Sequence, residues 1–430
     1  MSLDLNVARI MKRGLRAIIF ITTLLHAGFF FQEDKKTTER MPPPMDIVYE
    51  KNEAFHILNE RREAMGMNTL SWNDTLSDAA QNHAAYLVKN HLHLHDEDPE
   101  REGFTGIAPV DRAWKSGYAS SWVLENLSTQ NIDARDSIDG LLGAIYHRFA
   151  FLDISIDEIG IGLFQKTDET RNSAFVYLMG NSSLNALCYK RPFSGYGKYV
   201  YKVCQNQEHK VSRKEYDKAK ESNVWLNPEM ILYPYDGQRN VPPAFYSEIP
   251  DPLPDYEVSG FPVSVTFNRY FFDKVDIRSF ELYDQHEKSV VPVRILDRQS
   301  DPHKHFNAYQ YALFPLKRLE YDSRYHVHIS YIVNKEEKQK DWYFYTRKPK
   351  EKMFKITEKE ATVKMKRGES YLLYLVPLDG HDIVKDVTFP DDIDLTFMDN
   401  NTLRIKTISE SSDDFTLHCG KHTVHIDIID

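Results

Sequence analysis

The strongest constraint on the fold of this 430-residue chain is a change of sequence pattern near residue 185. Before that point, apolar residues recur at helical spacing, as Leu76, Ala80 and Leu87 do, and the alternating run 174–179 predicts a strand. After it come short, aromatic-rich alternating runs such as 263–267, which predict β-strands. The length exceeds one ordinary hydrophobic core. We therefore expect an α/β unit followed by two small all-β domains of the immunoglobulin-like sandwich type.

These shifts in composition divide the chain into six expected parts. They are a signal peptide or N-terminal anchor at 1–31, a polar tether at 32–45, the α/β domain at 46–185, a cysteine-bracketed loop with a proline-rich linker at 186–254, an immunoglobulin-like β domain at 255–348 and a C-terminal β domain at 353–430.

The N-terminus carries an export pattern. Lys12, Arg13 and Arg16 precede an apolar run from 17 to 31, which is typical of a signal peptide. The run is shorter than the roughly 20 residues that a membrane-spanning helix needs, yet an uncleaved anchor is also consistent with it. Either interpretation places the protein outside the cytoplasm, as a secreted, periplasmic or anchored protein.

Charge narrows the range of partners. The chain has 64 acidic and 54 basic residues, a net charge of −10, and its basic residues are scattered. This distribution argues against nucleic acid as a partner. We expect membrane contact only through the N-terminal segment.

Two of the three cysteines, Cys188 and Cys204, bracket a segment rich in Tyr, Gly and Lys. In an oxidising compartment they could form a disulfide that closes this loop. Two reduced, buried thiols are an equally consistent interpretation. Cys419 lies in a strand-like run and is interpreted as a core residue.

Candidate site chemistry is spread over about fifty residues: the cluster His91-Leu-His-Leu-His95, then Glu125, then His147. Two imidazoles and a carboxylate can bind a divalent metal with an open position for water. The carboxylate can instead act as a general base or orient an imidazole. Residue types alone favour a simpler interpretation, a solvated helix end at His95. His83 lies on an apolar helical stripe and is interpreted as a core histidine.

Other catalytic patterns are missing from the sequence. There is no Gly-x-Ser-x-Gly motif, no glycine-rich phosphate loop and no catalytic context around any cysteine. His326 and His328 alternate, which a half-exposed strand explains, and the charged run 335–340 is interpreted as a solvated hairpin tip.

Several short motifs together resemble the CAP superfamily, named for cysteine-rich secretory proteins, antigen 5 and pathogenesis-related proteins. The resemblance spans about 47 to 179, and the linker is similar to segments that join CAP modules to immunoglobulin-like domains in bacterial exported proteins. The motifs are Leu70-Ser-Trp72, Ala80-Gln-Asn-His-Ala84, Gly103-Phe-Thr-Gly106, Glu125-Asn-Leu127, His147-Arg148 and Gly160-Ile-Gly162.

The resemblance implies a three-layer α-β-α sandwich with a cleft lined by two histidines and two acidic residues. In some members of the family these residues hold zinc or another divalent ion. His95 and His147 take the histidine positions as candidate metal ligands, and Glu125 takes the first glutamate position as the candidate catalytic residue. The second glutamate has no counterpart, and the nearest acid, Asp139, lies one helical turn too early.

With the cleft incomplete, we expect a non-enzymatic, extracytoplasmic binding or interaction protein for a small ligand, a lipid or a cell-envelope partner. One alternative is a divalent-metal-dependent, peptidase-like hydrolase that uses the same cleft. Another is a surface structural or adhesion protein that acts through its β domains.

Overall fold

The computed structural model of the protein describes residues 43–168, 172–408 and 414–430. The described residues all belong to one compact unit of the chain, residues 37–430. The expected signal or anchor and most of the expected tether lie outside the described residues. Among the helices that the structure describes, none is long and apolar enough to span a membrane.

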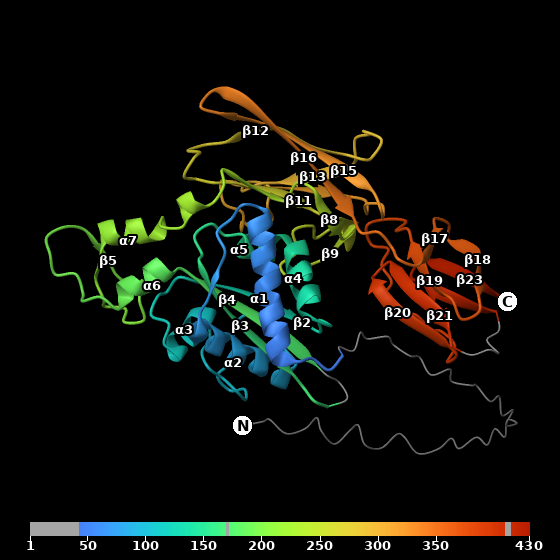
Figure 1. The fold of residues 1–430 in the computed structure, drawn as a ribbon, viewed down its shortest axis with the longest axis horizontal. Helices are drawn as coiled ribbons and strands as arrows, with labels where there is room; N and C mark the ends of the chain where they lie inside the picture. Colours follow the sequence, from blue (N-terminus) through green and yellow to red (C-terminus); the bar gives the residue numbers. More distant parts are fainter. Residues whose placement is uncertain (1–42, 169–171, 409–413) are drawn as a thin grey trace, which may run out of the picture. The chain divides into compact units, whose positions relative to one another are not determined.

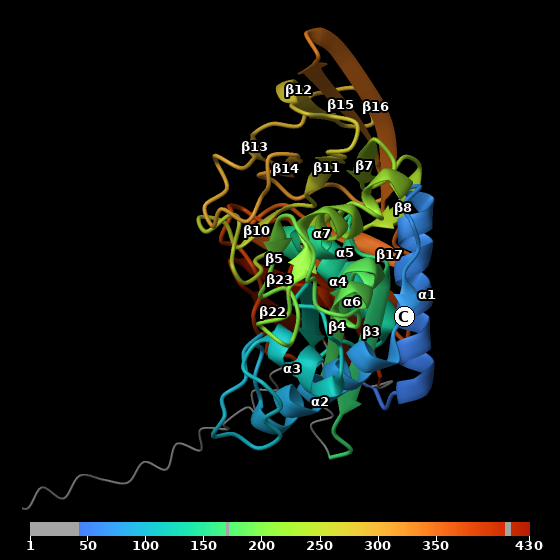
Figure 2. The same ribbon diagram turned by 90° about the vertical axis from the view of Figure 1, so that its left-hand side faces the viewer.

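The first domain is a four-stranded sheet with helices on both faces, as the resemblance implied (Figures 1 and 2). Its strand order is β1-β3-β4-β2, with β1 parallel to β3 and the other pairs antiparallel. The strands are β1 (Ser71–Trp72), β2 (Val123–Thr129), β3 (Glu158–Gln165) and β4 (Ser173–Gly180); the helices are α1 (Ile47–Ala64), α2 (Asp74–Asn90), α3 (Pro109–Ser116), α4 (Ala134–Gly143) and α5 (Ile145–Phe151).

Alternation along β4 explains the three layers. Phe175 and Tyr177 pack in one hydrophobic core with α1 and α4, whereas Ala174 and Val176 pack in another with α2. Every residue of β4 is therefore buried, as expected for a strand covered on both faces. At Gly162 the sheet and α2 approach so closely that a Cβ would lie 2.2 Å from the backbone carbon of Ala80, so only glycine fits.

The cysteine-bracketed segment has structure of its own. Cys188 and Cys204 form a disulfide, which settles the alternative that the sequence left open. The elements here are α6 (Ser182–Cys188), β5 (Tyr199–Val200), β6 (Val211–Ser212), α7 (Arg213–Lys220) and a short 3₁₀ helix at Val224–Leu226. Buried side chains of α6 and α7 form a small separate core with Cys204.

The next domain is built of two four-stranded sheets, ordered β13-β14-β11-β7 and β12-β15-β16-β8, with a two-stranded β9-β10 sheet beside them. The expected linker contributes to it, because β7 pairs with β11 and β8 with β16. The strands are β7 (Met230–Tyr233), β8 (Gln238–Val241), β9 (Ala244–Tyr246), β10 (Val258–Gly260), β11 (Val263–Phe267), β12 (Asp276–Tyr283), β13 (Val293–Leu296), β14 (Gln310–Pro315), β15 (Arg324–Val333) and β16 (Glu336–Thr346).

The C-terminal domain has a hydrophobic core of its own between sheets ordered β17-β19-β21-β20 and β18-β23-β22. Cys419 belongs to that core, as predicted, and burial raises the pKa of its thiol to about 12. The strands are β17 (Lys352–Ile356), β18 (Glu360–Lys366), β19 (Ser370–Leu375), β20 (Ile393–Asp399), β21 (Thr402–Thr407), β22 (Phe415–Cys419) and β23 (His422–Ile429).

Candidate functional site

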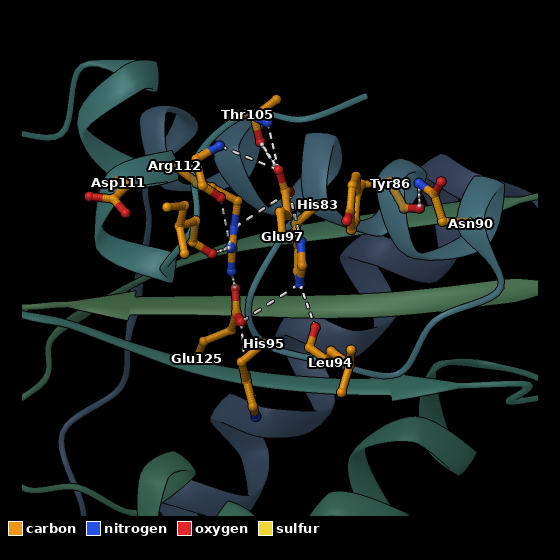
Figure 3. Close-up of polar contacts among 12 residues, drawn as sticks. His83, Tyr86, Asn90, Leu94, His95, Glu97, Thr105, Asp111, Arg112 and Glu125 are labelled. Atoms are coloured by element: carbon orange, nitrogen blue, oxygen red, sulfur yellow. Dashed lines mark hydrogen bonds and ion pairs between the residues drawn. The ribbon is translucent and has the colours of Figure 1, made fainter. Parts of the chain in front are cut away.

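The first half of the candidate site joins His95 to Glu125. Glu125 points from β2, and its side chain is only 1% exposed. His95 lies in the loop after α2, is 47% exposed, and places Nδ1 2.9 Å from Glu125 Oε1 (Figure 3). Because a carboxylate only accepts, the Nδ1–H of His95 donates this bond, and Nε2 makes no hydrogen bond with any residue that the structure describes.

Arg112 of α3 forms a buried ion pair with Glu125. Its Nη2 donates to Glu125 Oε2 at 2.7 Å, and both side chains are buried (Figure 3). Burial raises the pKa of Glu125, but the hydrogen bond from His95 and the charge of Arg112 outweigh it, so this pKa lies below its ordinary value. Glu125 is therefore an ionised carboxylate at neutral pH.

A second buried pair supports the first. His83 is fully buried, as predicted for a core histidine, with Nδ1 2.9 Å from Glu97 Oε1 and Nε2 3.1 Å from the carbonyl of Leu94. Thr105 N also donates to Glu97. Burial raises the pKa of Glu97, but the hydrogen bonds from His83 and Thr105 lower it by more. The pKa of Glu97 therefore lies below its ordinary value. The histidine that the sequence assigned to the core thus lies directly behind the candidate site, 3.9 Å from Glu125.

The second half of the site joins His147 to a residue that sequence reasoning missed. His147 of α5 places Nδ1 2.9 Å from Glu248 Oε2, and the two side chains are 15% and 5% exposed. The other oxygen of Glu248 accepts the backbone N–H of Ile145 at 2.6 Å, at the start of α5. The site therefore contains a second carboxylate, from the segment expected to be a linker.

The two halves face one another. The rings of His95 and His147 stack with centroids 6.5 Å apart and planes inclined by 24°. Each imidazole has a carboxylate on Nδ1, so each ring in its neutral form presents an Nε2 lone pair. Such an arrangement can accept hydrogen bonds from a hydroxyl or amine group.

The other acidic and imidazole candidates lie elsewhere. Asp139 pairs with Arg61 at 3.3 Å and lines the same cavity as Glu248, and among the described residues it makes no ion pair with His147. His93 contacts Thr129 and His91 contacts Asn172, so only His95 of the histidine cluster belongs to the site.

The donor set does not fit a protein-bound metal ion well. A zinc site takes at least three protein ligands, and here both carboxylates are bound to Nδ1 atoms of the histidines. Within the described ranges, no three His, Cys, Asp or Glu side chains are grouped so that they could hold a metal ion. The site itself presents two imidazole Nε2 atoms as possible metal ligands.

A cavity of about 480 Å³ adjoins the second half of the site, because Glu248 lines it. This is within the size range of small-molecule pockets. Its walls include apolar and charged side chains from α4 and the turn before it, from the segment 242–248 and from later parts of the chain, among them Ile132, Asp136, Pro242, Phe245, Phe261, Arg347 and Met398.

Comparison with known proteins supports the assignment of the first domain. Residues 55–181 match the model of the cysteine-rich secretory protein family, CAP. No curated protein matches the chain.

Three solved structures resemble part of the chain. An extracellular protein containing an SCP domain from Bacillus anthracis is 19% identical, with 32% of this chain and 44% of that one covered and a TM-score of 0.28. An outer surface protein from Borrelia burgdorferi is 24% identical, with 33% of this chain and 98% of that one covered and a TM-score of 0.28. A cysteine-rich secretory protein from Staphylococcus aureus is 17% identical, with 32% of this chain and 40% of that one covered and a TM-score of 0.20. The chain thus spans less than half the length of the first and third of these proteins.

Proposed function

Because residues 55–181 form a CAP domain, we propose that this chain is an exported binding protein that holds a small ligand at the paired imidazoles of His95 and His147. The observation that carries this proposal is the pair of carboxylate-oriented rings, stacked 6.5 Å apart, whose Nε2 atoms have no hydrogen-bond partner among the described residues. The disulfide between Cys188 and Cys204 supports export, because such bonds persist in oxidising compartments.

The chemistry of the site indicates the class of ligand. Two Nε2 lone pairs accept hydrogen bonds from hydroxyl or amine groups. The adjoining cavity adds apolar walls at Phe245, Phe261 and Met398. The proposed ligand is therefore a small amphipathic molecule with a hydroxyl or amine head that bonds to the imidazoles and an apolar body in the cavity.

Native mass spectrometry of the exported protein, released gently from cells, tests this proposal. We expect the wild-type protein to carry a bound small molecule. The double variant His95→Ala/His147→Ala should bind it about tenfold or more weakly, because two hydrogen bonds of about 1 kcal/mol each are lost. His326→Ala/His328→Ala, on a half-exposed strand face of the β domain, is the matched control and should keep the ligand. Equal occupancy in wild type and the His95/His147 variant would contradict the proposal.

The hydrolase alternative and the adhesion alternative stay predictions from the sequence. The donor set of two imidazoles gives the metal-dependent hydrolase no additional support. Among the described residues, no contact of the β domains favours the adhesion alternative over a binding role for the CAP cleft.

A further inference from the structure

The disulfide closes a loop with an unusual composition. Residues 189–202 contain four basic residues and no acidic residue, in a chain whose net charge is −10. The same stretch holds four tyrosines. The loop is therefore a local positive, aromatic surface on an acidic protein.

The tyrosines of this loop are turned to solvent. Tyr196 is fully exposed, and Tyr189, Tyr199 and Tyr201 are 65%, 46% and 54% exposed. Large aromatic side chains with a polar tip that stay in solvent are typical of surfaces that meet a partner. Lys210 lies 4.9 Å from the ring centre of Tyr199 and adds a fifth basic group beside the loop.

Most of the basic groups have no acidic partner. Lys190 pairs with Glu215 at 3.0 Å. Arg191, Lys198 and Lys202 are exposed and make no ion pair with any described residue. Three uncompensated charges are therefore available to an anionic surface.

The loop is also held in shape before any partner arrives. The disulfide joins its ends, and β5 pairs with β6 through Tyr199 and Ser212. Phe193 N donates to Lys210 O across the loop. Figure 1 shows the loop between α6 and α7, at the edge of the ribbon. A preformed surface loses little conformational entropy on binding.

We propose that this loop, residues 189–202 with Lys210, docks onto the surface of an anionic lipid bilayer. Tyrosine is favoured at the depth of lipid headgroups, and each nearby Lys or Arg adds attraction to anionic lipids. The loop exposes no Leu, Ile, Trp or Phe, and Phe193 and Val200 are half-buried. It therefore rests among headgroups without inserting deeply. This contact is independent of the candidate site, and it extends the expectation from the sequence, which placed membrane contact only in the N-terminal segment.

Vesicle co-sedimentation of residues 37–430 tests the proposal, since these residues form one compact unit and lack the apolar N-terminal run. The probes are vesicles of phosphatidylcholine alone and of phosphatidylcholine mixed with phosphatidylglycerol. We expect binding only to the anionic vesicles, weakening as salt is raised. The variant R191E/K198E/K202E should bind roughly a hundredfold more weakly or worse. Y196S/Y201S, which leaves the charge intact, should also bind more weakly.

The matched control is K338E/K340E/K364E, which makes the same charge change at three exposed lysines elsewhere. It should bind like the wild-type protein, and circular dichroism should show all variants folded. Three results would overturn the proposal: equal binding to both kinds of vesicle, an equal loss in the control, or retention on an anionic polysaccharide such as dextran sulfate with no vesicle binding.

Discussion

Replacing Arg112 with leucine should lower the free energy of unfolding of the CAP domain by about 3–5 kcal/mol at neutral pH. Arg112 is buried and donates to Glu125, which is also buried. Its Nε lies 3.8 Å from the carboxylate of Glu97. Leucine would leave two buried carboxylates without this cation, and the cost of an uncompensated buried charge exceeds that of the lost hydrogen bond itself.

The loss should also depend on pH. In the wild-type protein the pKa values of Glu97 and Glu125 are lowered below 4.5, so their stabilising effect is complete above that value and disappears as the pH falls through the folded-state pKa. Removing Arg112 raises both pKa values. Protonation of these two carboxyl groups then removes the uncompensated charge in the variant. The difference in the free energy of unfolding between wild type and variant should therefore become smaller between pH 7 and pH 4. Urea denaturation at several pH values measures this.

The surface pair Arg101–Asp98 provides a matched control, since both side chains are about half exposed at 3.6 Å. Arg101→Leu should change the free energy of unfolding by less than about 0.5 kcal/mol. An Arg112→Leu deficit that matches this control, or that stays constant with pH, would contradict the role given to Arg112.

Replacing Arg148 with methionine should cost about 3 kcal/mol, for a different reason. This guanidinium is fully buried, and the burial lowers its pKa to about 10. It donates to the carbonyls of Leu142 and Pro262 at 2.6 and 2.8 Å. It also packs over the rings of Tyr233 and Phe261, 4.7 and 5.1 Å from their centres. Methionine fills similar space but leaves those carbonyls without a donor.

Arg148 also joins two domains, because Leu142 belongs to the CAP domain and Pro262 to the β domain. Differential scanning calorimetry of Arg148→Met should therefore show the unfolding of the two domains separating into distinct transitions. Arg135→Met, which removes an arginine that is 53% exposed and only 3.7 Å from Glu53, should leave the wild-type trace unchanged. A single unshifted transition in Arg148→Met would count against this account.

Local patterns carried much of the sequence prediction. Helical and strand periodicity predicted an α/β unit, and the resemblance implied its three layers. Phe175 and Val176 face opposite layers, as alternation along a strand requires. His95 separates from His91 and His93 because motif order, rather than residue type, placed it in the cleft. The Cys188–Cys204 pair was left open because spacing alone cannot tell a disulfide from two thiols.

Glu248, the part of the site that sequence reasoning missed, could not be predicted from local sequence patterns. Glu248 lies 101 positions from His147, in a proline-rich segment with no local sign of a site. Its position depends on how the chain returns from the CAP domain to β9, which is a tertiary property. The segment was interpreted as a linker because it is rich in proline, and its strands β7 and β8 are only four residues each.

The central claim is that Glu248 orients His147 and so completes the site from outside the CAP match. Nuclear magnetic resonance of protein labelled with ¹⁵N-histidine tests it directly, with His147→Ala used to assign the signals. We predict that neutral His147 carries its proton on Nδ1 in the wild-type protein and shifts toward the Nε2–H tautomer in Glu248→Ala, while Asp251→Ala leaves it unchanged. Identical His147 ring signals in wild type and Glu248→Ala would contradict the claim.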